Sequence, residues 1–188
     1  MRITGGQWRG ASIAVPAGDA VRPMPEKVRQ ALFNSLGDWI AGQRVLELFA
    51  GTGCLSIECL SRGAVSATCV ELSGRHAQFI HRNATAVGAT QISVRVQDAL
   101  VAVRDLASAT QTFDFIVADP PYGEKNVGRR SQSWAQRLLD AAELPALLAP
   151  GGRLMLGHAK RDQIELVPPW REVKALKHGD TWVRLLAL

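Results

Sequence analysis

Short strand-like and helix-like segments alternate along the chain, and this alternation limits its possible folds more than any other feature. The clearest unit is residues 44–63, where a β-prone run ends in a tight glycine turn and a helical pattern follows. Further strands are predicted at residues 67–72, 92–96, 113–118 and 153–157. Repeated strand–helix units predict an α/β fold with a mostly parallel sheet that is covered on both faces.

Helices are predicted between these strands and before the first of them. Ser73 is a suitable N-cap for a helix that ends at Gly88, and apolar residues between Trp134 and Leu148 predict another helix. Residues 28–39 also have helical spacing and follow two prolines.

The two ends of the chain depart from the repeating unit. Residues 170–176 and 181–188 predict two strands joined by a glycine-bearing turn, which would form an antiparallel C-terminal hairpin. Residues 1–24 are expected to form a basic arm with a small hairpin of its own. Residues 25–188 then form the core, and residues 1–188 are predicted to be one domain.

Composition narrows the class of protein. A chain of 188 residues with 47% hydrophobic and 21% charged residues has an ordinary globular balance. Cys54, Cys59 and Cys69 lack metal or disulfide spacing, so we expect reduced, buried cysteines and no metal site. No stretch approaches the roughly 18 apolar residues of a membrane span, and residues 1–10 contain no apolar run. The expected location is the cytoplasm, with no membrane partner.

The positive charge of the chain is concentrated and rich in arginine. The formal net charge is +5, and 17 of the 22 cationic residues are arginine, which suits bidentate phosphate contacts and base stacking. Basic residues gather in residues 1–30 and 124–137, which favours a nucleic acid partner over simple solubility. The residues expected to contact RNA are Arg2, Arg9, Arg22, Arg29, Lys125, Arg129 and Arg130.

Acids and glycines at the ends of strands predict a cofactor site. The turn from Gly51 to Ser56 lacks the third glycine of the dinucleotide pattern, which argues against a nicotinamide cofactor. Glu47, Glu71 and Asp98 lie at the ends of three consecutive strands, where ribose hydroxyls, an adenine and a positively charged methionine portion would find acceptors. This favours S-adenosylmethionine, although Glu71 and Asp98 are each also explained as helix caps. Glu47 lies inside its strand and should need a cationic or amino partner.

A second predicted site follows the strand at residues 113–118. That strand stops at Asp119-Pro120-Pro121-Tyr122, where the two prolines cannot donate to a sheet and make the turn stiff. The Asp119 carboxylate and the flat face of Tyr122 suit a planar ring with an exocyclic amino group, as in a nucleobase. The alternative is that Tyr122 has only a structural role, as an aromatic residue of the hydrophobic core.

These motifs resemble a known family of enzymes. The chain is similar to the DPPY-type, S-adenosylmethionine-dependent amino-methyltransferases and, within them, to the bacterial ribosomal RNA guanine methyltransferases of the RsmD type, which act on the small subunit. The resemblance lies in residues 2–10, 22–23, 28–34, 48–53, 60–64, 119–122 and 179–181. It therefore covers nearly the whole chain.

The resemblance implies a fold, a reaction and a set of residues. The fold is a Rossmann-like, seven-stranded class I methyltransferase sheet, and the reaction is methylation of guanine N2 in 16S ribosomal RNA, by a monomer acting on the RNA or on the small ribosomal subunit. The implied cofactor-binding residues are Glu47, Phe49, Gly51, Thr52, Gly53, Glu71, Leu72, Asp98, Ala99 and Asp119. The implied catalytic residues are Asp119, Pro120, Pro121 and Tyr122.

The target amine would be held by Asp119-Pro120-Pro121-Tyr122, which we call the proline elbow. We expect the Asp119 carboxylate and the Pro120 carbonyl to accept its two hydrogens while Tyr122 stacks on a flipped-out base. The chain departs from the family at Glu47, where aspartate is commoner, and at residues 156–161, which are basic where relatives usually carry acids. Two alternatives stay open: a DNA adenine methyltransferase, and an RNA-binding relative without catalytic activity.

Overall fold

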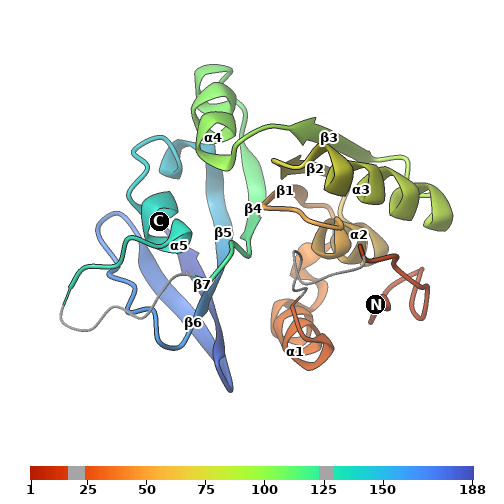
Figure 1. The fold of residues 1–188 in the computed structure, drawn as a ribbon, viewed down its shortest axis with the longest axis horizontal. Helices are drawn as coiled ribbons and strands as arrows, with labels where there is room; N and C mark the ends of the chain where they lie inside the picture. The colour runs from red at the N-terminus through yellow and green to blue at the C-terminus, as the bar shows by residue number, and fades with distance from the viewer. Residues whose placement is uncertain (17–23, 123–128) are drawn as a thin grey trace. The chain divides into compact units, whose positions relative to one another are not determined.

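The computed structural model describes residues 1–16, 24–122 and 129–188 (Figure 1). Two of the residues predicted to contact RNA, Arg22 and Lys125, lie outside these ranges. The chain divides into two compact units, Met1–Ala99 and Leu100–Leu188.

The sheet of the first unit is parallel. Its strands are β1 (Arg44–Leu48), β2 (Ser66–Glu71) and β3 (Ile92–Val96). β2 pairs with β1 on one side and with β3 on the other, in parallel register on both sides. Because parallel strands end at the same edge, the carboxyl ends of all three lie together. The sequence predicted each of these strands to within one residue.

Helices in the first unit begin and end where local signals require. They are α1 (Glu26–Leu36), the short 3-10 helix η1 (Gly37–Ile40), α2 (Cys54–Ser61) and α3 (Gly74–Val87). The Ser73 side chain caps α3 by accepting a hydrogen bond from the backbone N–H of His76, and Gly88 ends the helix in the left-handed conformation. Both caps confirm the prediction from the sequence.

Within residues 1–16 of the N-terminal arm the chain forms a small hairpin, as predicted. Arg2 and Ser12 form an antiparallel bridge, and the Ile3 N–H donates to the Ala11 carbonyl at 3.0 Å. Ile3 and Ile13 then pack with buried residues of α2. Every residue of α2 is buried, which explains why this helix has no polar face in the sequence.

The second unit combines parallel and antiparallel pairing. Its strands are β4 (Phe113–Ala118), β5 (Leu148–Ala159), β6 (Arg171–His178) and β7 (Thr181–Ala187). β4 and β5 are parallel, whereas β7 is antiparallel to both β5 and β6. The β6–β7 hairpin, drawn in blue in Figure 1, is the predicted C-terminal hairpin.

Three predictions about the second half need correction. The helix α4 (Ala99–Ser108), whose bounds were not predicted beyond Asp98 as a helix cap, leads into this unit. The helix expected through Leu148 is only α5 (Trp134–Leu139), followed by the 3-10 turn η2 (Pro145–Leu147).

β5 also begins five residues before the predicted start at Arg153. Phe113 pairs with Leu148 but Phe115 pairs with Arg153, so the extra residues form an irregularity in the strand. A β-carbon on Gly152 would lie 2.9 Å from the Asp114 carbonyl oxygen. The glycines that indicate a turn in the sequence therefore permit this irregularity.

The strand order is β3-β2-β1 in the first unit and β4-β5-β7-β6 in the second, which gives seven strands in all. This is the mixed α/β sheet with an antiparallel C-terminal hairpin that the resemblance implied. Among the helices of the described ranges, none has both the length and the apolar character needed to cross a membrane.

Candidate functional site

Glu71, the last residue of β2, holds the glycine turn that follows β1. Its Oε2 accepts a hydrogen bond from the Gly51 N–H at 2.7 Å, and its Oε1 accepts one from the Ser73 N–H at 2.9 Å. The Nδ1 atom of His76 lies 3.5 Å from Oε1. One carboxylate thus connects the turn after β1 to the start of α3, so Glu71 has a structural role whether or not it also contacts a cofactor.

The glycine turn is tight because of its backbone angles and its packing. Gly53 has a φ of +70°, and a β-carbon there would lie 2.7 Å from the Cγ2 atom of Ile80. Phe49, just before the turn, also has a positive φ of 59°. Positive φ is unfavourable for residues other than glycine, so the backbone near the turn has an unusual conformation that the surrounding structure must stabilise.

Glu47 has a partner of a different kind from the one expected. It is buried, and its Oε2 accepts a hydrogen bond from the backbone N–H of Ser56 at 2.8 Å, in the first turn of α2. A helix N-terminus carries partial positive charge and unpaired N–H groups, so it stabilises a buried carboxylate. The predicted need for a cationic or amino partner is therefore met at least in part by the protein itself.

Asn83 on α3 ties the N-terminal arm to the glycine turn. Its Nδ2 donates to the carbonyl oxygens of Thr52 and Ala14, both at 3.0 Å, and its Oδ1 accepts from the Ala14 N–H at 2.8 Å. Asn83 is buried, as is Thr52. Asn83 was not predicted as a site residue, although an asparagine beside the apolar face of Ile80 and Ala84 is a signal that a buried polar contact exists.

Glu58 on α2 is a second residue that the sequence analysis missed. Its Oε2 accepts from the Thr4 N–H at 2.8 Å, and its Oε1 accepts from the Thr4 hydroxyl at 2.7 Å and from Arg62 Nε at 2.9 Å. Arg29 Nε lies 3.5 Å from Glu58 Oε2, and both side chains are fully buried. Because a phosphate has no access to a buried guanidinium, the structure argues against the predicted RNA contact of Arg29 and gives it an ion pair inside the unit.

The outer strand ends of the first unit present apolar side chains to solvent. Leu72, directly after β2, is 69% exposed, and Val96, which pairs with Glu71 at the end of β3, is 60% exposed. Asp98 and Ala99 follow β3; Asp98 is half-buried and Ala99, the first residue of α4, is buried. An acid and exposed apolar side chains at neighbouring strand ends suit a ligand with a polar sugar and a flat apolar ring.

In the second unit, Asp119 has the properties of a functional acid. It follows the last residue of β4, and its Oδ1 atom is buried without a hydrogen-bond partner among the described residues. Burial raises the pKa of Asp119 from its ordinary value of 3.8 to about 7. A β-carbon on Gly157 would lie 2.2 Å from this oxygen, so the glycine of β5 leaves room for the carboxyl group. Buried polar atoms without partners are rare, and they indicate sites where a ligand binds.

The rest of the elbow fixes the aromatic ring. Pro120 is buried, Pro121 is exposed and Tyr122 is partly buried. The Tyr122 hydroxyl donates a hydrogen bond to Oγ1 of Thr181 at 3.0 Å, which ties the ring to the start of β7. Tyr122 is therefore not a fully buried core aromatic.

His158, where the chain departs from the family pattern, is neutral and buried in β5. Arg184 Nε donates to its Nε2 at 3.2 Å, so Nδ1 carries the proton and contacts the Ala159 carbonyl at 3.0 Å. Burial lowers the pKa of His158. Arg184 also pairs with Glu172 at 3.2 Å.

The remaining predicted RNA contacts divide by exposure and by pairing. Arg2, Arg9 and Arg129 are exposed. Arg130 is exposed too, but it forms two hydrogen bonds to Asp140, at 2.7 and 2.9 Å, and one to Glu165 at 2.9 Å. A phosphate would have to compete with two carboxylates for Arg130.

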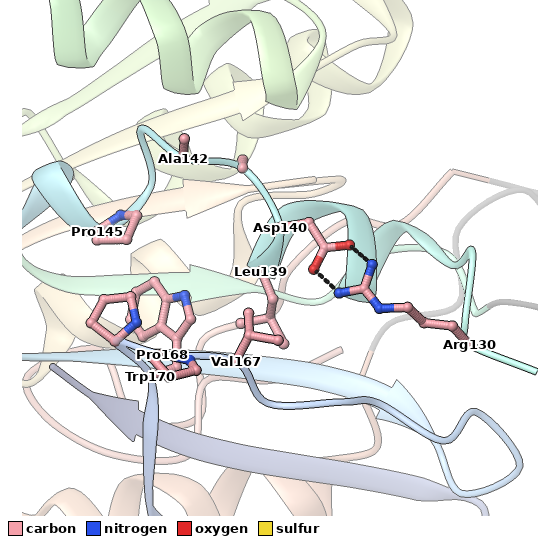
Figure 2. Close-up of a pocket in the computed structure, with 10 residues that line it drawn as sticks. Arg130, Leu139, Asp140, Ala142, Pro145, Val167, Pro168 and Trp170 are labelled. Carbon is pink, nitrogen blue, oxygen red and sulfur yellow. Dashed lines mark hydrogen bonds and ion pairs between the residues drawn. The ribbon is translucent and has the colours of Figure 1, made fainter.

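A pocket of about 350 Å³ lies beside this ion pair (Figure 2). Pro145, Val167, Pro168 and Trp170 line it, and Arg130 and Asp140 stand at one side. Its lining contains neither Asp119 nor Tyr122. The pocket is therefore separate from the elbow.

Comparison with known proteins places this geometry in a family. Residues 1–187 match the model of the family described as Conserved hypothetical protein 95. The chain belongs to this family. The match spans the arm, the glycine turn and residues 119–122.

Individual relatives agree with the family assignment. The ribosomal RNA small subunit methyltransferase D of Escherichia coli K12 is 35% identical over 122 residues, which cover 65% of this chain and 60% of that protein. The solved E. coli protein yhhF is 25% identical, with a TM-score of 0.83 and coverage of 99% of this chain and 96% of that one. SMU.776, solved with S-adenosylhomocysteine (SAH), has a TM-score of 0.64 over 85% of this chain and 48% of its own; at 17% identity it shows the fold alone.

Proposed function

We propose that this protein transfers a methyl group from S-adenosylmethionine to the exocyclic N2 amine of a guanine in 16S ribosomal RNA. The family relative from E. coli is named for methylation of small-subunit ribosomal RNA, and the matched segment covers 60% of it. The observation that carries the proposal for this chain is the buried, unpartnered Oδ1 of Asp119 in a proline elbow. An acceptor in that position can hold a hydrogen of the amine while its lone pair attacks the methyl group, and can take the proton that the methylated nitrogen must release.

The first unit has residues that fit the cofactor. Both Glu71 oxygens already accept backbone N–H groups, but each retains acceptor capacity for a ribose hydroxyl. Leu72 and Val96 offer exposed apolar surface for an adenine. Gly51 and Gly53 have no side chains, so a cofactor can approach the backbone of this turn closely. Phe49, Thr52, Asp98 and Ala99 complete the proposed set around the same strand ends. Glu47 would act through α2, whose first turn it anchors. When bound, the cofactor supplies an electrophilic methyl group.

The second unit has residues that fit the amine. With the pKa of Asp119 near 7, the carboxyl group is increasingly ionised above neutral pH and then accepts a hydrogen bond from the guanine amine at Oδ1. The Pro120 carbonyl is proposed to accept the second hydrogen. Both contacts draw the amine hydrogens out of the plane of the base, so the nitrogen becomes closer to tetrahedral. Its lone pair is then less delocalised into the ring and is available for attack. Tyr122, held by Thr181, would stack on the base.

Exposed arginines of the chain are proposed to reach the RNA substrate. The substrate is ribosomal RNA or the small subunit, reached by exposed arginines at Arg2, Arg9 and Arg129. We propose that residues 1–188 act as one methyltransferase domain, as a monomer and in the cytoplasm.

The test uses small subunits and naked 16S ribosomal RNA from a strain that lacks the gene. Wild-type protein and tritiated S-adenosylmethionine should label the RNA, and mass spectrometry of digested nucleosides should identify N2-methylguanosine. Asp119→Ala and Tyr122→Ala should each lose most activity, whereas Asp38→Asn, which alters an exposed acid in η1, should not.

Three outcomes would contradict the proposal. Activity within threefold of wild type in both elbow variants would remove the elbow from the reaction. Labelling of duplex DNA in place of RNA would favour an adenine methyltransferase. Absence of heat on titration with millimolar SAH would favour an RNA-binding protein without catalytic activity.

A further inference from the structure

The end of the β6–β7 hairpin lies at the same sheet edge as the elbow. β4 and β5 are parallel, β7 runs antiparallel to β5, and Thr181 pairs with both Ala159 and His178. The carboxyl ends of β4, β5 and β6 and the start of β7 therefore share one edge of the second unit. The hydrogen bond from Tyr122 to Thr181 connects the elbow directly to this hairpin end.

Three cations gather around this hairpin end. Lys160 and Arg161 directly follow β5, and the Lys160 N–H donates to the Asp180 carbonyl at 2.8 Å, which holds this segment against the turn of the hairpin. Lys177 lies near the end of β6, with its Nζ 4.3 Å from the centre of the Trp182 ring. All three side chains are exposed. We call Lys160, Arg161 and Lys177 the hairpin-end cations.

Nothing in the described ranges neutralises these charges fully. The ion pairs of this unit use Arg130 and Arg184, and none within residues 129–188 involves a hairpin-end cation. Asp180 is an exposed acid nearby, which leaves three cations against one acid. The Trp182 ring limits the freedom of the Lys177 ammonium, so less entropy is lost when it binds a phosphate.

Resting on the proposed function, we infer that the hairpin-end cations bind phosphates of the RNA strand beside the target guanine. A flipped base at Tyr122 must be continuous with a backbone that passes within a few ångströms of the elbow, and Thr181 connects that elbow to the cations. The basic residues after β5, which depart from the family pattern, then have a role in binding rather than in the transfer step. Phosphate contacts of this kind position the strand without reading its sequence.

The test compares two triple variants with equal loss of charge. Lys160→Ala/Arg161→Ala/Lys177→Ala removes the hairpin-end cations, and Arg82→Ala/Arg95→Ala/Arg104→Ala removes three exposed arginines on α3, β3 and α4. Binding of 16S ribosomal RNA is measured by filter binding from 50 to 300 mM salt. SAH titration and circular dichroism check that both variants are folded.

Each contact with a single-strand phosphate contributes roughly 0.7 to the magnitude of the slope of log affinity against log salt. Loss of the three hairpin-end cations should therefore lower the magnitude of this slope by about 2. The control variant should keep the wild-type slope. At saturating RNA, kcat of the hairpin-end variant should stay within threefold of wild type while KM rises.

Equal slopes for the two variants would overturn the inference and leave the proposed function intact. Loss of binding to small subunits but not to naked RNA would also overturn it, because the partner would then be a ribosomal protein. Wild-type protein that binds and methylates no ribosomal RNA would overturn the inference and the proposed function together.

Discussion

Acids with buried carboxyl oxygens differ between the two units in how those oxygens are hydrogen-bonded. In the first unit, Glu47, Glu58 and Glu71 each accept hydrogen bonds from backbone N–H groups and hold a helix, the arm or the glycine turn. In the second unit, Asp119 has a buried oxygen without a partner in the described ranges. An acid with partners stabilises the fold, whereas an acid without one lowers stability and is retained for a ligand. Asp162, whose Oδ2 is also buried without a partner, accepts a hydrogen bond from the Ser131 hydroxyl at Oδ1, whereas Asp119 has no hydrogen bond among the described residues.

The strongest test of this comparison replaces Asp119 with Asn. The variant keeps the shape of the side chain but removes the carboxylate acceptor, so methyl transfer should fall by about 100- to 1,000-fold. SAH affinity, measured by calorimetry, should change by less than about threefold. A similar loss of SAH affinity and activity would instead make Asp119 a cofactor ligand.

The second test replaces Glu58 with Gln in the first unit. Arg29 would become a buried charge without its acid, and Thr4 would lose part of its anchor, so the free energy of unfolding should fall by about 3 to 5 kcal/mol. Urea unfolding measures this fall. Glu26→Gln, in the exposed first turn of α1, is the matched control and should cost less than about 1 kcal/mol. Equal effects of the two variants would show that the contacts of Glu58 with Thr4 and Arg29 do not anchor the arm.

The third test separates two reasons for a glycine in the turn after β1. Gly53 and Gly88 have similar positive φ values, +70° and +74°, but a β-carbon meets Ile80 at Gly53 and open space at Gly88. Gly88→Ala should cost about 1 to 2 kcal/mol from backbone strain alone. Gly53→Ala should cost about 1 to 3 kcal/mol more because of overpacking, and should weaken SAH binding. Equal unfolding free energies would mean that Ile80 moves aside.

The smallest expected effect is at Thr181. Thr181→Val removes the acceptor for the Tyr122 hydroxyl, and one neutral hydrogen bond of about 1 kcal/mol corresponds to about a fivefold fall in kcat/KM. Thr181→Ser should restore the wild-type value. If Ser fails to restore activity, the contribution of Thr181 is packing and not its hydrogen bond.

Local signals in the sequence predicted much of the fold. Ser73 and Gly88 bound α3, and the strand ends at Glu71 and Val96 follow from short apolar runs. β5 was predicted to start at Arg153, where a continuous strand-like run begins, because the sequence does not show that residues 148–152 join the strand through an irregularity.

The site was less predictable because its decisive contacts join distant residues. Thr4 and Glu58 are 54 positions apart, and no local pattern shows that Arg29 also pairs with Glu58 in the folded protein. The sequence identified Asp119 from its prolines and its strand. It did not show that the carboxyl oxygen lacks a partner, since that depends on how β5 packs against it at Gly157.

The most direct test of the central claim is the pH dependence of stability in wild type and Asp119→Asn. The pKa of Asp119 is 3.8 unfolded and about 7 folded, so between these values the unfolded state releases a proton that the folded state keeps. Wild-type stability should therefore fall relative to the variant as pH rises.

Urea unfolding without ligand, from pH 5 to pH 8.5, measures this difference. The free energy of unfolding of the variant, relative to that of wild type, should rise by about 1.4 kcal/mol per pH unit up to about pH 6.5. This difference should level off above pH 7. A difference that does not change with pH would contradict the account, because Asp119 would then be an ordinary carboxylate with partners like those of Glu47 and Glu71.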